Sequence, residues 1–223
     1  MDLGLKDKVA LITGGSKGIG LATATVLAQE GAKVAICARG NVHLQKAKEE
    51  IFAKTGQKIL TIVCDVTKEE DCERAVEETV RHYGRIDILV NNAGTSFAKS
   101  FLEVAPEDWK KDLDLKLFGA IHCSRYAVPF MKKQGGGAIV HVTASLAKTP
   151  GASSMPTSIS RAAGMALTKA MSKDLGPDNI RVNTVCIGLI RSDQIEKKWQ
   201  REAPHLTWEE YSREQGRTIP LGR

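Results

Sequence analysis

A glycine-rich turn near the start of the chain has residue types suited to binding a phosphate group. Glycine lets the backbone turn tightly and approach a pyrophosphate, and a following helix points free N–H groups and its positive dipole end at the anion. The turn lies between the bare apolar run Val9–Thr13, typical of a strand buried on both faces, and a helical pattern that begins at Gly18. We therefore predict a dinucleotide-binding turn with the sequence Thr13-Gly14-Gly15-Ser16-Lys17-Gly18-Ile19-Gly20.

The end of the second predicted strand bears on the choice between the two nicotinamide cofactors. An acidic side chain there would bind the ribose hydroxyls of NAD and repel the 2′-phosphate of NADP. The sequence instead has Cys37-Ala38-Arg39, and a guanidinium suits a phosphate. Lys17 can add a second positive charge, although both cations could also be ordinary solvated side chains. The pattern favours NADP(H).

Short apolar runs alternate with longer helical patterns along the chain. Strands are predicted at 9–13, 33–38, 60–64, 86–90, 138–142 and 180–185, and helices at 18–30, 42–54, 68–83, 106–133 with breaks, and 158–175. In the first helix we expect Ile19, Ala22, Val26 and Leu27 to face inward. The alternation predicts an α/β fold with a doubly wound parallel sheet, the three-layer α/β/α Rossmann fold, in one domain over 1–223. The charged segment at about 189–216, with its three aromatic residues, is interpreted as a lid over the substrate.

Composition argues against several other classes of protein. The net charge is +6, but the basic residues are dispersed and aromatic residues make up only 5%, which does not favour a nucleic-acid-binding protein. No apolar run approaches the ~20 residues that span a bilayer, and the N-terminus lacks the pattern of a secretory signal. Five scattered cysteines without metal-ligand spacing suggest reduced core residues. We expect a cytoplasmic protein without a metal.

Further motifs give the chain a resemblance to the short-chain dehydrogenase/reductase family in its compact one-domain form, over roughly residues 5 to 223. The glycine turn matches the family's Thr-Gly-x-x-x-Gly-x-Gly, Cys64-Asp65-Val66 its adenine-contacting Asp-Val, and Asn91-Asn92-Ala93-Gly94 its Asn-Asn-Ala-Gly. Ile180–Asn183 and Gly188 match the segment that closes over the nicotinamide. The resemblance implies a cofactor site formed by Gly14, Ser16, Lys17, Gly18, Ile19, Gly20, Arg39, Asp65, Val66, Asn92, Ala93, Gly94, Arg161 and Gly188.

The catalytic positions implied by the resemblance depart from the family's pattern. Ser145 fits the serine that steadies the substrate oxygen. Thr157 stands in place of the proton-transferring tyrosine, Arg161 in place of the lysine four residues later, and Lys116 in place of an asparagine of the proton relay. A threonine hydroxyl is far less acidic than a phenol, and arginine does not release its proton in this pH range. The spacing is kept, but the family's proton chemistry is not.

Three functions therefore remain open. The first is an active NADP(H)-dependent oxidoreductase for a carbonyl or alcohol substrate with a rebuilt acid/base, for which Lys116, Lys148 and Tyr211 are candidates; each could instead be an ordinary surface or packing residue. The second is an NADP-binding pseudoenzyme or partner subunit without oxidoreductase turnover. The third is a different reaction, on a substrate that supplies its own proton.

The resemblance also bears on assembly and on the C-terminus. Family members usually pair through the two long helices, here 106–133 and 158–175, so we expect a homodimer or homotetramer. They also usually continue past a Pro-Leu-Gly-Arg-like segment into a further helix and a final edge strand. The given sequence ends at Ile219-Pro220-Leu221-Gly222-Arg223, so the final strand is expected to be absent from it, either because the sequence is truncated before that strand or because the protein dispenses with it.

Overall fold

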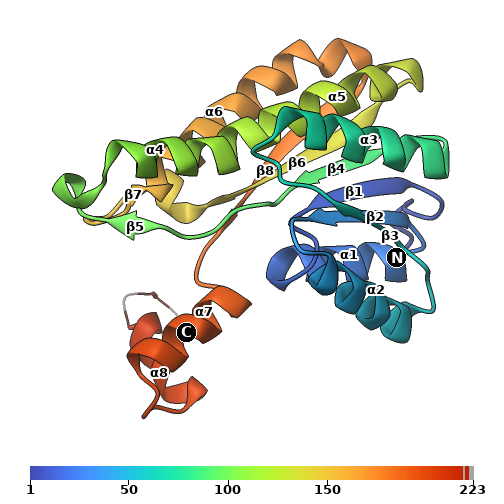
Figure 1. Cartoon of the computed structure of the whole chain (residues 1–223). Coiled ribbons are helices and arrows are strands. Elements are labelled where there is room, and N and C mark those ends of the chain that lie inside the picture. The colour runs from blue at the N-terminus through green and yellow to red at the C-terminus, as the bar shows by residue number, and fades with distance from the viewer. Residues whose placement is uncertain (218, 221–223) are drawn as a thin grey trace. The chain divides into compact units, whose positions relative to one another are not determined.

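A computed structural model describes residues 1–217 and 219–220, and the chain divides into two compact units, Met1–Gly188 and Leu189–Arg223. The first unit contains a parallel sheet in the order β3-β2-β1-β4-β6-β8 (Figure 1). Its strands are β1 (Val9–Thr13), β2 (Lys33–Ala38), β3 (Leu60–Val63), β4 (Ile88–Asn91), β6 (Gly137–Ala144) and β8 (Ile180–Ile187). The order grows outward from β1 in both directions, which is the doubly wound arrangement and confirms the predicted Rossmann fold.

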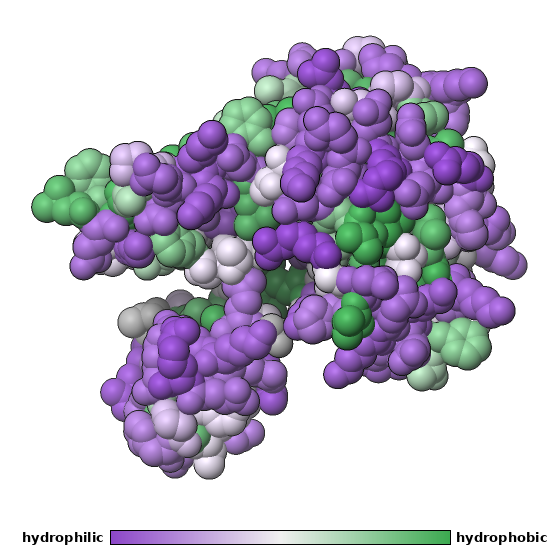
Figure 2. Space-filling model, in the orientation of Figure 1, coloured by the Kyte–Doolittle hydropathy of each residue, from purple (hydrophilic) through white to green (hydrophobic). Residues whose placement is uncertain are grey.

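Helices cover the two faces of this sheet (Figure 1), and hydrophilic residues cover most of the visible outer surface of this unit (Figure 2). On one face lie α1 (Gly18–Gln29) and α2 (Asn41–Thr55); on the other lie α3 (Glu69–Tyr83), α4 (Pro106–Leu113), α5 (Gly119–Lys133) and α6 (Thr157–Asp174). Two hydrophobic cores result, and β1 contributes to both, with Ile12 in the core beneath α1 and α2 and Leu11 in the core beneath α3 and α5. Because successive strand residues face opposite sides, a strand covered on both sides is apolar throughout.

Helix α1 confirms the predicted helix but not its predicted buried face. Ala22 is exposed and Val26 is 52% exposed, and the buried side consists of small residues: Gly20, Ala24, Thr25 and Ala28. Small residues let this helix lie close to the sheet and to the glycine turn. Leu27 does pack, half-buried, against the core beneath this helix, so the prediction is right there and wrong for Ala22 and Val26. Apolar residues surround the helix on most sides, so the sequence gives no clear inward direction.

The predicted long helix over 106–133 is interrupted by a π-helical turn. Asp114–Phe118 forms this wider turn between α4 and α5, and π-turns inside helices often lie at functional sites. Two short strands that the sequence did not predict, β5 (Ala98–Lys99) and β7 (Met155–Pro156), pair antiparallel outside the main sheet. Single turns of 3-10 helix occur at Phe101–Glu103, Ser145–Ala147 and Gly176–Asp178.

Strand β8 is an edge strand within residues 1–188, since it pairs only with β6 there. Val185 on this strand is 53% exposed. The second unit contains α7 (Asp193–Glu202) and α8 (Trp208–Gly216), which bring the rings of Trp199, Trp208 and Tyr211 into contact. No further strand follows among the described residues, and Leu221–Arg223 lie outside them. None of the described helices meets the length and hydropathy needed to cross a membrane.

Asp87 fastens the start of β1 to the chain just before β4. Its carboxylate accepts a hydrogen bond from the buried Val9 N–H at 2.9 Å and from both branches of the Arg85 guanidinium. We expect Asp87→Ala to lower the free energy of unfolding by about 1–3 kcal/mol, because it leaves a buried N–H without a partner. Urea unfolding followed by circular dichroism measures this. Glu50→Ala, which breaks only an exposed pair with Lys54, is the control and should cost no more than about 0.5 kcal/mol.

Candidate active site

The glycine turn connects the buried strand β1 to the N-terminus of α1. Gly18 has a φ of +52°, a conformation that favours glycine, and a side chain added there would meet no atom within 4 Å. A Cβ on Gly20 would lie 2.3 Å from the carbonyl oxygen of Gly14, so the helix can approach the turn only with glycine. The first turn of α1 has no acidic residue and no capping side chain, and its first amides have no carbonyl partner within the helix. Open space and free N–H groups together fit a phosphate.

The cationic residues predicted to select the cofactor lie at the carboxyl ends of neighbouring strands. The Gly15 N–H donates to the carbonyl of Cys37 at 3.2 Å, which brings the turn beside the end of β2. Lys17 and Arg39 are both exposed, and neither forms an ion pair with another described residue. Their charges are therefore available to an anionic group at this edge.

Asp65 and Val66 follow β3 and have different surroundings. The Asp65 carboxylate accepts hydrogen bonds from the Thr67 N–H at 3.1 Å and the Thr67 hydroxyl at 2.9 Å, which holds the loop. Val66 is 5% exposed and packs beside Gly119, where a Cβ would lie 2.8 Å from a methyl carbon of Val66. The loop is thus fixed in place at the edge where the cofactor is predicted.

Asn92 holds the glycine turn from the neighbouring strand end. Its side-chain amide donates to the carbonyls of Thr13 at 2.9 Å and Gly14 at 3.3 Å. The Thr13 hydroxyl in return accepts from the backbone N–H groups of Asn92 and Ala93, each at 3.0 Å. The family motif at 91–94 therefore fixes the shape of the turn from inside the protein.

Gly94, in the motif that follows β4, lies beside the side chains of two residues at catalytic positions, Arg161 and Lys116. A Cβ there would come 3.0 Å from Nη2 of Arg161 and 3.5 Å from Cγ of Lys116. A small residue is therefore needed where the end of β4 meets α6 and the π-helical turn. The open turn, the free helix amides and the exposed cations fit a nicotinamide dinucleotide, with its nicotinamide end expected toward Gly94 and Arg161.

Lys116 is the residue whose surroundings differ most from an ordinary surface lysine. Its side chain is 2% exposed, its ammonium forms a buried ion pair with Asp112, and it donates to the Thr157 hydroxyl at 2.8 Å. The Ser160 hydroxyl donates to the other carboxylate oxygen of Asp112 at 2.5 Å. Burial lowers the pKa of Lys116 to about 8, against the opposing effect of Asp112, so the amine can change protonation near neutral pH.

The Thr157 hydroxyl is fully occupied by bonds within the protein. It donates to the carbonyl of Phe97 at 2.7 Å and accepts from the Phe97 N–H at 3.0 Å and from Lys116. A hydroxyl offers one proton and two lone pairs, so no bond remains for a substrate. Thr157 therefore holds Phe97, which precedes β5, and Lys116 at the start of α6. This structural role differs from the proton transfer expected at the position of the family's tyrosine.

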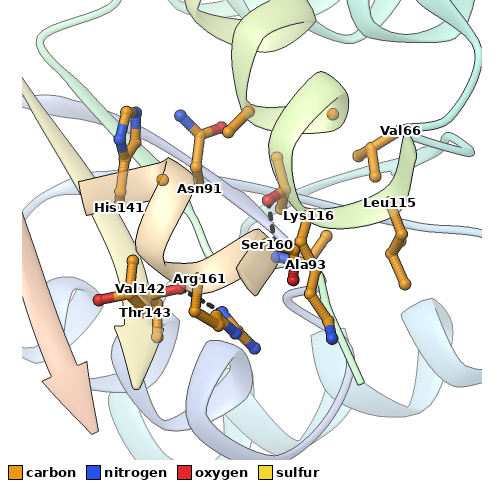
Figure 3. Close-up of a pocket in the computed structure, with 14 residues that line it drawn as sticks. Val66, Asn91, Ala93, Leu115, Lys116, His141, Val142, Thr143, Ser160 and Arg161 are labelled. Carbon is orange, nitrogen blue, oxygen red and sulfur yellow. Dashed lines mark hydrogen bonds between the residues drawn. The ribbon is translucent and has the colours of Figure 1, made fainter. Parts of the chain in front are cut away.

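Arg161 lies one helical turn further along α6, on the same side as Thr157. Its Nη1 donates to the carbonyl of Val142 at the end of β6, as the dashed line in Figure 3 shows. Its Nε is buried without a partner among the described residues. Burial lowers the pKa of this guanidinium and Asp112 opposes the shift.

The remaining predicted residues are not all brought together. Ser145 is exposed at the end of β6, and no described residue bonds its hydroxyl. Lys148 is also exposed and takes part in no described ion pair. Tyr211 is 4% exposed and packs against Trp208 inside the second unit. Gly188 is the last residue of the first unit. Of the three candidate replacements for the acid/base, the structure joins only Lys116 to a catalytic position.

Several site residues were missed by reasoning from the sequence. Asp112 is bonded to both Lys116 and Ser160. The backbone N–H of Phe97 donates to the Thr157 hydroxyl, and its carbonyl accepts from that hydroxyl. Asp112, Ser160 and Phe97 belong to none of the motifs that were matched. The Asp112–Lys116 spacing of four was a usable signal, because such residues lie on one face of a helix. The contact to Ser160 comes from 48 residues away and had no local signal.

Comparison with known proteins identifies the family of this chain. The family model of the short chain dehydrogenases matches residues 8–203. Human dehydrogenase/reductase SDR family member 4 is 38% identical over 196 residues, which are 87% of this chain and 70% of that protein. An oxidoreductase of Thermotoga maritima is 35% identical over 202 residues, 91% of this chain and 78% of that protein. The chain belongs to the short-chain dehydrogenase family, a family of oxidoreductases that bind a nicotinamide cofactor.

Solved structures show the same fold with either cofactor bound. L-sorbose reductase of Gluconobacter frateurii, complexed with NADPH and L-sorbose, aligns with a TM-score of 0.93 at 34% identity, covering 100% of this chain and 86% of that one. An NADPH-bound short chain oxidoreductase of Pseudomonas aeruginosa PAO1, described as containing an atypical catalytic center, gives 0.91 at 35% identity, covering 98% and 85%. An NAD⁺-bound xylitol dehydrogenase gives 0.87 at 30% identity, covering 98% and 87%. Similarity of fold therefore does not distinguish NAD(H) from NADP(H), and the choice between them depends on this chain's own residues.

Gly20 provides a direct test of the turn. We expect Gly20→Ala to weaken binding of the nicotinamide cofactor at least about tenfold and to lower the free energy of unfolding by about 1–3 kcal/mol, since the new methyl group meets backbone. Titration followed by NADPH fluorescence and urea unfolding measure the two effects. Gly176→Ala is the matched control, because a Cβ there meets no atom within 4 Å. Unchanged binding by Gly20→Ala would contradict the close approach of helix and turn.

Proposed function

We propose that this short-chain dehydrogenase is an NADP(H)-dependent oxidoreductase acting on a carbonyl or alcohol group of a small molecule, with Lys116 as its acid and base. One observation carries the proposal: a buried ammonium with a pKa near 8 is bonded to Thr157, the residue at the family's tyrosine position. A group that titrates close to the working pH is the one suited to transfer a proton in either direction.

The choice of NADP(H) is supported by charge at the edge of the sheet. Lys17 and Arg39 are exposed at the glycine turn and just after β2, and the residues that end β2 include no acid. A planar guanidinium can bind a 2′-phosphate with two hydrogen bonds. The NADPH complexes of L-sorbose reductase and of the Pseudomonas oxidoreductase are consistent with this assignment.

Lys116 has the capacity for the proton step. When bound, the nicotinamide supplies or removes a hydride, and the substrate oxygen must gain or lose a proton. Of the three N–H groups of Lys116, Asp112 and Thr157 take two, which leaves one for a substrate oxygen or for a water that contacts it. Protonated Lys116 would act as the acid in reduction, and neutral Lys116 as the base in oxidation.

Asp112 and Arg161 act on Lys116 in opposite directions. Asp112 raises the pKa of Lys116 and keeps the amine in place, whereas the positive charge of Arg161 lowers it. Arg161 would hold the ribose hydroxyls of the cofactor at the family's lysine position. Ser145, with its free hydroxyl, would steady the substrate oxygen. These roles are assigned by position in the family's motif and by the groups left free.

Assembly and location belong to the same proposal. A homodimer or homotetramer would form through α4–α5 and α6, where Ala162, Ala163, Gly164, Ala166 and Ala170 permit close helix approach. The protein would work in the cytoplasm as a single NADP-binding domain with residues 189–216 as its lid.

The cofactor is tested by titrating NADPH and NADH against the purified protein while following their fluorescence. We expect saturable binding of NADPH at micromolar protein, at least about tenfold tighter than that of NADH, because Arg39 contacts the 2′-phosphate. Arg39→Asp should reverse this preference, since the acid binds ribose hydroxyls and repels phosphate. Lys46→Asp on α2 controls for net charge. Absence of binding by either cofactor would contradict the proposal.

Turnover is tested by following NADPH consumption over a panel of aldehydes, ketones and ketoses. We expect Lys116→Met to lower kcat by about 10²–10⁴-fold with little change in NADPH affinity, because it removes the proton donor. In the wild type, reduction should slow as pH rises through about 8, where Lys116 loses its proton, and alcohol oxidation should speed up over the same range.

Two results would count against this mechanism. A rate in Lys116→Met equal to that of the wild type would remove Lys116 from the proton step. Tight NADPH binding without consumption on any substrate of the panel would favour the NADP-binding partner subunit, which the fully occupied Thr157 hydroxyl also allows.

A further inference from the structure

A small cavity, lined by both apolar and polar residues, extends from the catalytic residues into the interior between α6 and the sheet. Its space open to the centre of a water molecule is about 20 Å³, enough for one or two waters. Figure 3 shows His141 and Asn91 at one end of this cavity and Arg161 and Lys116 at the other. His141 is 3% exposed and Asn91 is 7% exposed, and they are register partners on β6 and β4.

The hydrogen bonds around His141 determine which of its ring nitrogens carries the proton. Thr168 donates its hydroxyl proton to the carbonyl of Gly164 at 2.8 Å. The Thr168 oxygen, 2.9 Å from Nδ1 of His141, can then only accept, so Nδ1 is the protonated nitrogen. Burial lowers the pKa of His141, which keeps the ring neutral. Its Nε2 is therefore a lone-pair acceptor, and it has no partner among the described residues.

Two further buried atoms, on residues that line the same cavity, also lack partners in the part of the chain that the structure describes. Oδ1 of Asn91 is an acceptor, because its amide nitrogen already donates to Ser124 at 3.0 Å. Nε–H of Arg161 is a donor. Unsatisfied buried polar atoms are costly, most of all on a charged group. Here one donor and two acceptors belong to residues that line one small cavity. A water molecule can accept from the donor and give a proton to each acceptor, directly or through a second water.

We propose that this cavity holds one or two ordered waters that join Nε of Arg161 to Nε2 of His141 and Oδ1 of Asn91, and that His141 thereby acts as a positioning residue for Arg161. The water site depends only on the atoms that line the cavity. The effect on the cofactor rests on the proposed function, because it requires Arg161 to contact bound NADP(H).

Arg161 needs these water-mediated acceptors because it is an arginine at the position where the family has a lysine. A lysine side chain has no donor at the position of Nε, whereas arginine adds one beneath its charged head. The acceptors His141 and Asn91 satisfy this additional donor through water. Without them Nε would have to leave the cavity for solvent, and the guanidinium would move with it.

The water site is tested on the wild-type protein without reference to activity. A high-resolution crystal structure should show one or two ordered waters between the three atoms. Long-range ¹H–¹⁵N correlation spectra should show His141 as the Nδ1–H tautomer with its Nε2 accepting a hydrogen bond. A dry cavity, or the Nε2–H tautomer, would overturn the proposal even if the protein binds NADPH and turns over substrate.

The positioning role is tested by a double-mutant cycle read out as NADPH affinity. His141→Phe removes the acceptor and should raise the Kd for NADPH about tenfold, the size expected for one unsatisfied charged donor. His141→Gln, which can place an amide oxygen near the position of Nε2, should restore affinity to within about twofold. His82→Phe, at an exposed histidine on α3, is the control and should change nothing.

The second arm of the cycle uses Arg161→Lys, which removes Nε while keeping the charge. In that background His141→Phe should change the Kd less than about twofold. An equal loss in both backgrounds would show that His141 acts on packing alone and would contradict the coupling. If the wild type does not bind NADPH but the ordered waters are present in it, the proposed function fails and the water site is still confirmed.

Discussion

The arrangement of the site depends on one constraint, that the strands of the sheet run parallel and therefore end at the same edge. The glycine turn after β1, the Asn92 motif after β4 and the end of β6 meet there because their strands are neighbours in the order β1-β4-β6. The Thr13 hydroxyl and the Asn92 amide convert this proximity into a fixed geometry, since each bonds the other strand's end. Binding in crevices at this edge is the general behaviour of doubly wound sheets.

Buried charge is the second determinant of the site. Lys116 and Arg161 place two cations in the interior, and Asp112 is the carboxylate that pairs with Lys116. Desolvation disfavours the charged form of the lysine strongly enough to bring its pKa near 8 even beside a carboxylate. The arginine keeps its charge because its ordinary pKa is so high. One cation can therefore exchange a proton in the physiological range, and the other provides a permanent charge.

The departures from the family's motif form a connected set in the structure. The family's tyrosine is replaced by a threonine whose hydroxyl holds Lys116, and the relay asparagine is replaced by that lysine. Under the proposed function, the position of the proton-transferring group shifts from Thr157 at the start of α6 to Lys116 in the π-helical turn before α5, to which the Thr157 hydroxyl is hydrogen-bonded. The Pseudomonas oxidoreductase with an atypical catalytic center shows that the same fold accommodates catalytic departures.

The sequence by itself was sufficient for the fold and for the position of the glycine turn between β1 and α1, because both rest on local patterns. An apolar run, a glycine turn and a helix are adjacent in the chain, and the repeated alternation predicts a parallel sheet. Which face of α1 is buried could not be predicted, because its apolar residues are not confined to one side. Only the tertiary structure brought Lys116 to Thr157 and Ser160 to Asp112, across 41 and 48 residues of chain. Desolvation depends on every element packed around a group, so the lowered pKa of Lys116 is a property of the folded protein alone. The same holds for the buried Nε2 of His141, which has no partner among the residues that the structure describes.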